Sequence, residues 1–175
     1  MRRDSSQSLT RITSHKSRFT NHVSDTVHPD IIELARTIAA AHELEPALVC
    51  AVIEQESAWN PWAVRYEPGF LSRYIAPLYT AGKLSATEAY TRSMSWGLMQ
   101  VMGQVAREFG FETDSLPELC DPATGIEFGC RILAKRMART RGDVSAALLA
   151  WNGGANPNYP SEVLARTRNY SSKPG

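Results

Sequence analysis

The sequence predicts an all-α domain, on three observations. Apolar residues recur at helical spacing in several stretches, helix-capping residues stand just before those stretches, and no stretch shows the apolar and polar alternation of a half-buried strand. The 175 residues, 43% of them hydrophobic, suffice for one domain with a hydrophobic core. We therefore expect one domain over residues 29–164, a flexible N-terminal arm at 1–28 and a C-terminal tail at 165–175.

The arm and the first helix are separated by a change in composition. Residues 1–28 are rich in Ser, Thr, Arg and His and show no apolar period, which is typical of a flexible segment or of one that a partner orders. A helix is then expected from residue 29 to about His42. Its apolar stripe consists of Ile31, Ile32, Leu34, Ala35, Ile38 and Ala39.

The second helix is expected over residues 46–57 and carries a carboxylate near its end. At about 100° per residue, Glu56 falls on the same face as the apolar Val49, Val52 and Ile53. Apolar surroundings disfavour an ionised carboxylate, so the pKa of Glu56 would rise and the group could act as a general acid. The alternative is a Glu56 that simply ends the helix and reaches solvent.

After residue 61, the sequence signals for helices differ in strength from segment to segment. Residues 61–93 are punctuated by Pro and Gly, and within them the capping box from Ser85 to Glu88 predicts a short helix over 86–92. Four further helices follow from apolar periods, from the caps Asp121 and Asp143, and from closing glycines. They are expected over 98–109, 121–141, 143–151 and 160–166.

Three short motifs occur in order along these elements. They are Glu-Ser-Ala-Trp-Asn-Pro at 56–61, Gly-Leu-Met-Gln at 97–100 and Trp-Asn-Gly-Gly at 151–154. Together they resemble the soluble lytic transglycosylases (SLT) and the related goose-type lysozymes, over roughly residues 29–164. The resemblance implies a lysozyme-like helical fold with an active-site cleft. Residues 61–93 exceed the corresponding link in many of these enzymes, so we expect an insertion beside that cleft.

The resemblance also implies a reaction. Glu56 would protonate the glycosidic oxygen between N-acetylmuramic acid and N-acetylglucosamine in peptidoglycan, while the N-acetyl group of the sugar stabilises the charge at C1. The same carboxylate would then deprotonate the C6 hydroxyl and give a 1,6-anhydro product. This chemistry requires no metal and no cofactor.

The resemblance assigns further residues to the substrate cleft. These are Ser57, Gly97, Gln100, Met102, Trp151, Asn152 and Tyr159. Ser57 has the alternative of a purely local hydrogen bond, and Met102 that of core packing. Trp151 stands where most relatives have Tyr, and an indole can stack on a sugar ring but supplies no hydroxyl.

The closing tyrosine of the family's Glu-Thr-Arg-X-Tyr-Val pattern has two placements. Tyr159 begins an apolar helix, as the family has it, and is preferred over Tyr170. The family's Glu is absent in both placements, since Ala155 or Arg166 occupies its position.

Two alternative functions remain open. A goose-type lysozyme would hydrolyse the same bond with a water that a second carboxylate positions. Glu67 is the better candidate for that carboxylate and Glu88 the weaker one. A wall-binding or structural component of a virion would need no acid at all, and the presence of Glu56 argues against it.

The composition limits the kinds of partner and of metal or disulfide site that the sequence predicts. The formal net charge of +1 gives no reason to expect nucleic-acid binding, and no apolar run is long enough to span a membrane. Cys50, Cys120 and Cys130 show no CxxC spacing, so they suggest neither a zinc site nor a disulfide framework, although a Cys120–Cys130 bridge stays open. We expect a monomer.

The route to the cell wall follows from the N-terminus. Residues 1–28 are basic but lack the apolar region of a secretory signal. We therefore expect a protein made in the cytoplasm that reaches the wall through a phage particle, a lysis system or a secretion apparatus, with the arm as a docking segment.

Overall fold

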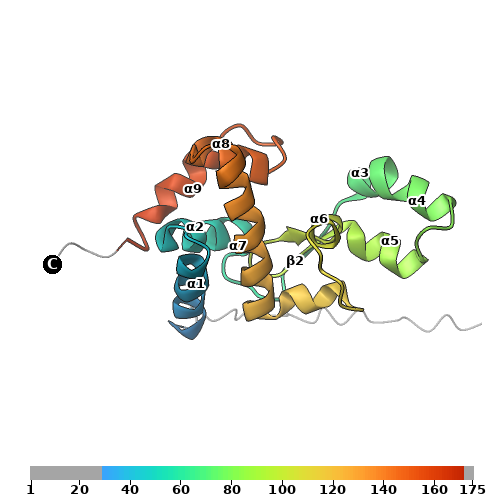
Figure 1. Ribbon diagram of the computed structural model, residues 1–175, viewed down its shortest axis with the longest axis horizontal. Helices are drawn as coiled ribbons and strands as arrows, with labels where there is room; N and C mark the ends of the chain where they lie inside the picture. The colour runs from blue at the N-terminus through green and yellow to red at the C-terminus, as the bar shows by residue number, and fades with distance from the viewer. Residues whose placement is uncertain (1–28, 172–175) are drawn as a thin grey trace, which may run out of the picture.

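The computed structural model describes residues 29–171 of the chain, and Figure 1 shows a mainly helical molecule with one small sheet. The helices are α1 (Pro29–Ala41), α2 (Pro46–Ser57), α3 (Pro68–Phe70), α4 (Ala76–Thr80), α5 (Ala86–Arg92), α6 (Gly103–Glu108), α7 (Pro122–Arg139), α8 (Val144–Trp151) and α9 (Tyr159–Thr167). The all-α, lysozyme-like class is confirmed. The predicted arm at 1–28 lies outside the described residues. The predicted boundary at residue 164 falls inside α9.

Helix α2 forms the centre of the core. All seven residues from Ala47 to Ile53 are buried, because α1 and α9 pack on this helix and the rest of the core surrounds it. Its start is fixed by Pro46 in the first turn and by Glu45, whose carboxylate accepts a hydrogen bond of 2.6 Å from the backbone N–H of Leu48. The end of α2, with Glu56, is thereby held by the most buried element of the molecule.

A three-stranded antiparallel sheet adjoins this helical body. Strand β2 (Met94–Trp96) pairs with both β1 (Val64–Tyr66) and β3 (Val101–Met102). The helix expected over 98–109 is therefore wrong in its first half, since only Gly103–Glu108 is helical. Gly97 (φ +68°) and Gln100 (φ +48°) adopt the left-handed conformation that turns β2 back onto β3.

Residues 67–92 form a separate group of short helices beyond the sheet. It contains α3, the π-helix η1 (Leu71–Ile75), α4 and α5, and Figure 1 shows it on the side of the sheet away from α2, α8 and α9. The predicted helix over 86–92 is confirmed as α5, where Ser85 Oγ accepts a hydrogen bond of 3.1 Å from the N–H of Glu88. Glu88 also joins α5 to α6, because Arg92 and Arg107 both donate to its carboxylate at 2.7 and 2.8 Å.

The C-terminal helices close the body around α2. The predicted caps hold, since Asp121 accepts from Thr124 N and Asp143 from Ala146 N. The 3₁₀ helix η2 (Leu116–Cys120) leads into α7. Within residues 29–171, no helix is both long and apolar enough to cross a membrane. The three cysteines are free and buried, so Cys120 and Cys130 form no bridge.

Candidate active site

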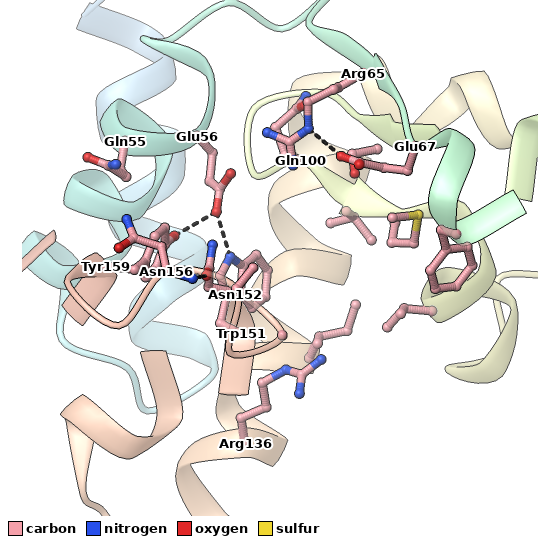
Figure 2. Close-up of a pocket in the computed structure, with 18 residues that line it drawn as sticks. Gln55, Glu56, Arg65, Glu67, Gln100, Arg136, Trp151, Asn152, Asn156 and Tyr159 are labelled. Atoms are coloured by element: carbon pink, nitrogen blue, oxygen red, sulfur yellow. Dashed lines mark hydrogen bonds and ion pairs between the residues drawn. The ribbon is translucent and has the colours of Figure 1, made fainter. Parts of the chain in front are cut away.

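A cavity of about 540 Å³ opens between the ends of α2, α8 and α9 on one side and the sheet on the other. Figure 2 shows Glu56, Trp151 and Tyr159 on one wall, and Arg65 and Glu67 on the opposite wall. The remaining lining comes from the β2–β3 hairpin, α7 and the loop after α8. Elements from distant parts of the chain thus meet around the Glu56 carboxyl.

The chain turns sharply just after Glu56, where α2 ends beside this cavity. Ala58 (φ +49°) ends the helix in the left-handed conformation, and Trp59 (φ +65°) continues it. Two successive non-glycine residues with positive φ are costly, and such backbone persists where the surrounding structure enforces it. The burial of the Trp59 side chain supplies part of that enforcement.

Two side chains donate to the same oxygen of Glu56. The Tyr159 hydroxyl lies 2.6 Å and the Trp151 indole Nε1 lies 2.9 Å from Oε1 (Figure 2). In the part of the chain that the structure describes, no hydrogen bond reaches Oε2 of this carboxyl. Since Oε1 is occupied as an acceptor, the proton of a neutral Glu56 belongs on Oε2.

Burial raises the pKa of Glu56 above its ordinary value. The hydrogen bonds from Tyr159 and Trp151, and the positive charge of Arg65, oppose this rise without cancelling it. Burial and the neighbouring Glu56 in turn raise the pKa of Tyr159, so this phenol stays protonated and remains a donor. The site therefore holds a carboxyl that keeps its proton to a higher pH than an ordinary glutamate does. In the described structure, no protein donor occupies the Oε2 oxygen that would carry this proton.

Gln100, Met102 and Asn152 also line the cavity. Gln100 Nε2 donates to the carbonyl oxygens of Ala63 and Gly97, both at 2.9 Å, and so ties the hairpin turn to the segment that precedes β1. Asn152 Oδ1 accepts a hydrogen bond of 2.7 Å from the N–H of Asn156 and fixes the loop after α8. These amides shape the walls, and Gln100 makes no hydrogen bond to Glu56 in the described structure.

Two residues expected in the cleft do not line it. Ser57 Oγ donates to the carbonyl oxygen of Ile53 at 3.1 Å, so its contact is local to the helix. Gly97 packs against the backbone of Leu119, and a Cβ at this position would overlap the Leu119 carbonyl oxygen. The glycine is therefore explained by a close approach of backbone to backbone and not by room for a glycan.

The two candidates for a second carboxylate differ in position. Glu67 lines the cavity, but Arg65 Nε lies 2.6 Å from its Oε1. Glu88 does not line the cavity, and the hydrogen bond from Arg107 is the main cause that lowers its pKa. The only carboxylate that faces Glu56 across the cavity among the described residues is thus already paired with a guanidinium.

Tyr159 and Tyr170 are separated clearly by the structure. Tyr159 contacts Glu56, whereas the Tyr170 hydroxyl accepts from Trp59 Nε1 at 2.8 Å and donates to Glu54 at 2.6 Å. The first placement of the tyrosine is therefore the one that reaches the cavity.

Several lining residues were not predicted. They are Gln55, Arg65, Phe70, Ser95, Val101, Val105, Ile132, Arg136, Gly153, Ala155 and Asn156. For Arg136 a signal existed, because it stands four residues after the buried Ile132, beside the apolar face of α7. For Arg65 and Phe70 the sequence offered none, since they reach the cavity only through the pairing of β1 and the turn that follows it. Among residues 29–171, no three His, Cys, Asp or Glu side chains gather as metal ligands would.

A family model and a similar protein, both described as transglycosylases, match the chain. A family model described as the transglycosylase SLT domain matches residues 33–171. A protein named transglycosylase, from Enterobacteria phage PRD1, is 29% identical over 134 residues, which make up 72% of this chain and 38% of that protein. The chain thus spans well under half the length of this relative. No solved structure matches the chain significantly.

Proposed function

Since the chain belongs to the transglycosylase SLT domain family, we propose that it is a peptidoglycan lytic transglycosylase with Glu56 as its acid and base. It cleaves the β-1,4 bond between N-acetylmuramic acid and N-acetylglucosamine without water. The observation that carries this proposal is the buried Glu56 carboxyl, held at one oxygen by Tyr159 and Trp151 and free of protein donors at the other.

Each proton transfer uses the free oxygen. Neutral Glu56 gives the proton on Oε2 to the glycosidic oxygen, and the bond from that oxygen to C1 breaks. The N-acetyl group of the muramic acid stabilises C1, as in the enzymes that the chain resembles. Ionised Glu56 then accepts the proton of the C6 hydroxyl while the C6 oxygen bonds to C1. The 1,6-anhydro ring closes and Glu56 is neutral again.

The two donors to Oε1 suit this cycle. They hold the carboxyl in one orientation through both transfers, and their hydrogen bonds strengthen when the group becomes an anion. The hydroxyl that Trp151 cannot supply is present as Tyr159, and the indole N–H acts as the second donor. The departure from the family's usual Tyr at position 151 therefore leaves Glu56 with a hydroxyl partner.

The environment of Glu67 supports the lyase over the hydrolase. A hydrolase of the goose type needs a second carboxylate that accepts a proton from water. The Glu67 carboxylate already accepts a hydrogen bond of 2.6 Å from Arg65 Nε at its Oε1, so one of the two oxygens that could accept a proton from water is engaged by the protein. This ion pair supports the lyase reaction, in which the C6 hydroxyl of the substrate attacks C1 in place of water.

Digestion of purified peptidoglycan by the wild-type chain and by Glu56→Gln tests the proposal. The wild type is expected to release muropeptides lighter by one water than hydrolysis products, as read by mass spectrometry. The Glu56→Gln variant should be slower by about 10²–10⁴-fold, the usual contribution of a general acid and base.

Other outcomes would point elsewhere. Products with reducing ends would make the chain a hydrolase and turn attention to Glu67. Binding to the wall without any release of products, by either protein, would instead indicate a structural or wall-binding component.

We further propose that the chain reaches the wall with a phage particle or a phage lysis system, through a partner that residues 1–28 contact. The support is the origin of the similar transglycosylase in a phage. Co-sedimentation of the full chain with phage particles, lost when residues 1–28 are removed, would be the expected result. Equal sedimentation of both forms would contradict it.

A further inference from the structure

Arg136 is an unpaired cation on the cavity wall. It lies on α7, one turn after Ile132, and both residues line the cavity that holds Glu56. Its Nε is buried and has no hydrogen-bond partner. Within residues 29–171, none of the six ion pairs includes Arg136. Figure 2 shows its side chain extending from α7 toward the cavity on the side of Trp151.

Without a ligand, the absence of an acidic partner for Arg136 among the described residues is unfavourable for the protein. The side chain is half-buried, and its Nε, which is withdrawn from water, has no protein acceptor or anion in the described structure that would replace the lost solvation. Burial, and then the positive charge of Arg139, lower the pKa of Arg136 accordingly, although an arginine keeps its proton in proteins. An apolar side chain of similar size would fill this part of the wall without that cost. The arginine is therefore better explained by an anion that arrives with the ligand.

Two other arginines of the chain have the acidic partner that Arg136 lacks within residues 29–171. Arg131, on the same helix, is exposed and pairs with Glu127, and Arg65 on the opposite wall pairs with Glu67. Arg136 is thus the cavity arginine whose donors have no protein acceptor in the described structure. A planar guanidinium binds a carboxylate through two parallel hydrogen bonds.

We propose that Arg136 binds a carboxylate carried on the muramic acid of the substrate, and so makes the cavity selective for glycan that bears this charge. This inference rests on the proposed function. The sugar rings of peptidoglycan are neutral. Its negative charge lies in the stem peptides attached to the lactyl groups, or in the lactyl carboxylates themselves where the peptide has been removed. Both sources present the same chemical group.

Binding to a catalytically disabled chain tests the inference without turnover. Three probes are titrated calorimetrically into the full chain carrying Glu56→Gln: a disaccharide tetrapeptide with free carboxylates, the same compound with its carboxylates amidated, and the disaccharide without peptide. The parent is compared with chains that also carry Arg136→Met or, as a matched control, Arg131→Met. Both variants remove one guanidinium from α7, but only the first changes the cavity.

The parent is expected to bind a free-carboxylate probe about tenfold more tightly than the amidated probe, as one charge-assisted hydrogen-bonded pair allows. Arg136→Met should abolish this preference and leave binding of the amidated probe unchanged, while Arg131→Met should keep the preference. A preference for the tetrapeptide locates the carboxylate in the stem, and a preference for the peptide-free disaccharide locates it on the lactyl group.

Two results would overturn the inference. One is equal binding of all probes by the parent, or no binding of any. The other is a loss in Arg136→Met that is the same for charged and amidated probes, which would indicate a structural role. Thermal unfolding distinguishes a structural role of Arg136 from a role in ligand binding. If the arginine serves binding, Arg136→Met should be at least as stable as the parent. Absence of anhydro products from the wild type would contradict the proposed function and would leave this binding result intact.

Discussion

Burial and two hydrogen-bond donors act in opposite directions on the pKa of Glu56, the proposed acid and base. Tyr159 and Trp151 both favour its ionised form, and burial favours its neutral form more strongly. Tyr159→Phe removes one donor, so the pKa of Glu56 should rise further. We expect kcat/KM to fall about 10- to 100-fold, as for a lost hydrogen bond to a charged group. The high-pH limb of the pH profile, where the acid loses its proton, should move to higher pH.

Tyr79→Phe is the control for that profile, because Tyr79 is half exposed on α4 and lies outside the cavity lining. A Tyr159→Phe profile that coincides with the wild type in its high-pH limb would show that the hydroxyl does not tune Glu56.

The raised pKa of Glu56 also makes stability depend on pH. Because the folded chain binds this proton more tightly than the unfolded chain does, the stabilisation is complete below the unfolded pKa and is lost as pH rises through the folded pKa. Glu56→Gln keeps the shape and stays neutral. It should therefore melt at a higher temperature than the wild type at alkaline pH, and the two melting temperatures should converge in acid.

Scanning calorimetry over a pH series measures this difference, with the exposed Glu112→Gln as the control. A wild type that is the more stable protein at alkaline pH would mean that the ionised carboxylate is well accommodated in the fold.

At the residue scale, helical periodicity placed Glu56 on an apolar face, whereas only the family resemblance indicated that Trp151 and Tyr159 lie near the same cleft. Glu56 could be placed from the apolar face of one helix, which is a local pattern. Its donors are 95 and 103 residues away along the chain, and periodicity carries no information on such contacts. The resemblance places Ser57 in the cleft, whereas its hydroxyl makes the local hydrogen bond to Ile53, which is the alternative for this residue.

The β2–β3 hairpin is the element whose geometry depends most on one residue. Gly97 combines a positive φ with a contact to the Leu119 backbone. Gly97→Ala should therefore cost about 2–5 kcal/mol in the free energy of unfolding, from backbone strain together with overpacking. Gly82 has nearly the same φ (+70°) but open space where a Cβ would lie. Gly82→Ala should cost about 1–2 kcal/mol, from strain alone.

Urea unfolding of both variants measures the difference. Equal losses would show that the approach to Leu119 relaxes when a methyl group is added, and the explanation of Gly97 by close packing would fail.

At the element scale, helices with capping residues were predicted well and the sheet was not. Ser85, Asp121 and Asp143 each accept the expected backbone N–H, because a cap acts within three residues. The strands are only two or three residues long, too short for an alternating pattern to stand out. The apolar residues between Leu98 and Met102 therefore predict the start of a helix, whereas the helix begins only at Gly103.

The whole molecule protects its three thiols. Cys50, Cys120 and Cys130 are buried, and burial raises the pKa of Cys50 to about 11 and that of Cys130 to about 12. Since the thiolate is the reactive form, we expect the folded chain to react with iodoacetamide only as fast as it unfolds. Labelling should be complete in concentrated urea. Rapid labelling of any one thiol under native conditions, located by peptide mass mapping, would show local opening of the core around it.

At the scale of the whole molecule, the helical class was predictable because helical periods are local. The placement of the cavity was not, because it depends on how the sheet and the short helices beyond it lie relative to the ends of α2, α8 and α9 (Figure 1). That placement brings the Arg65–Glu67 pair to one wall of the cavity and Arg136 to another. The proposed reaction and the proposed preference for a carboxylate depend on these positions.

If one carboxyl group cleaves the glycan without water, no oxygen from the solvent enters the product, so digestion of peptidoglycan in water enriched in the heavy oxygen isotope distinguishes the proposed lyase from a hydrolase. The wild-type chain is expected to release 1,6-anhydro muropeptides that carry no heavy oxygen, because the C6 oxygen of the sugar itself closes onto C1. Heavy oxygen at C1 of the released muramic acid would show that water is the nucleophile and would contradict the account.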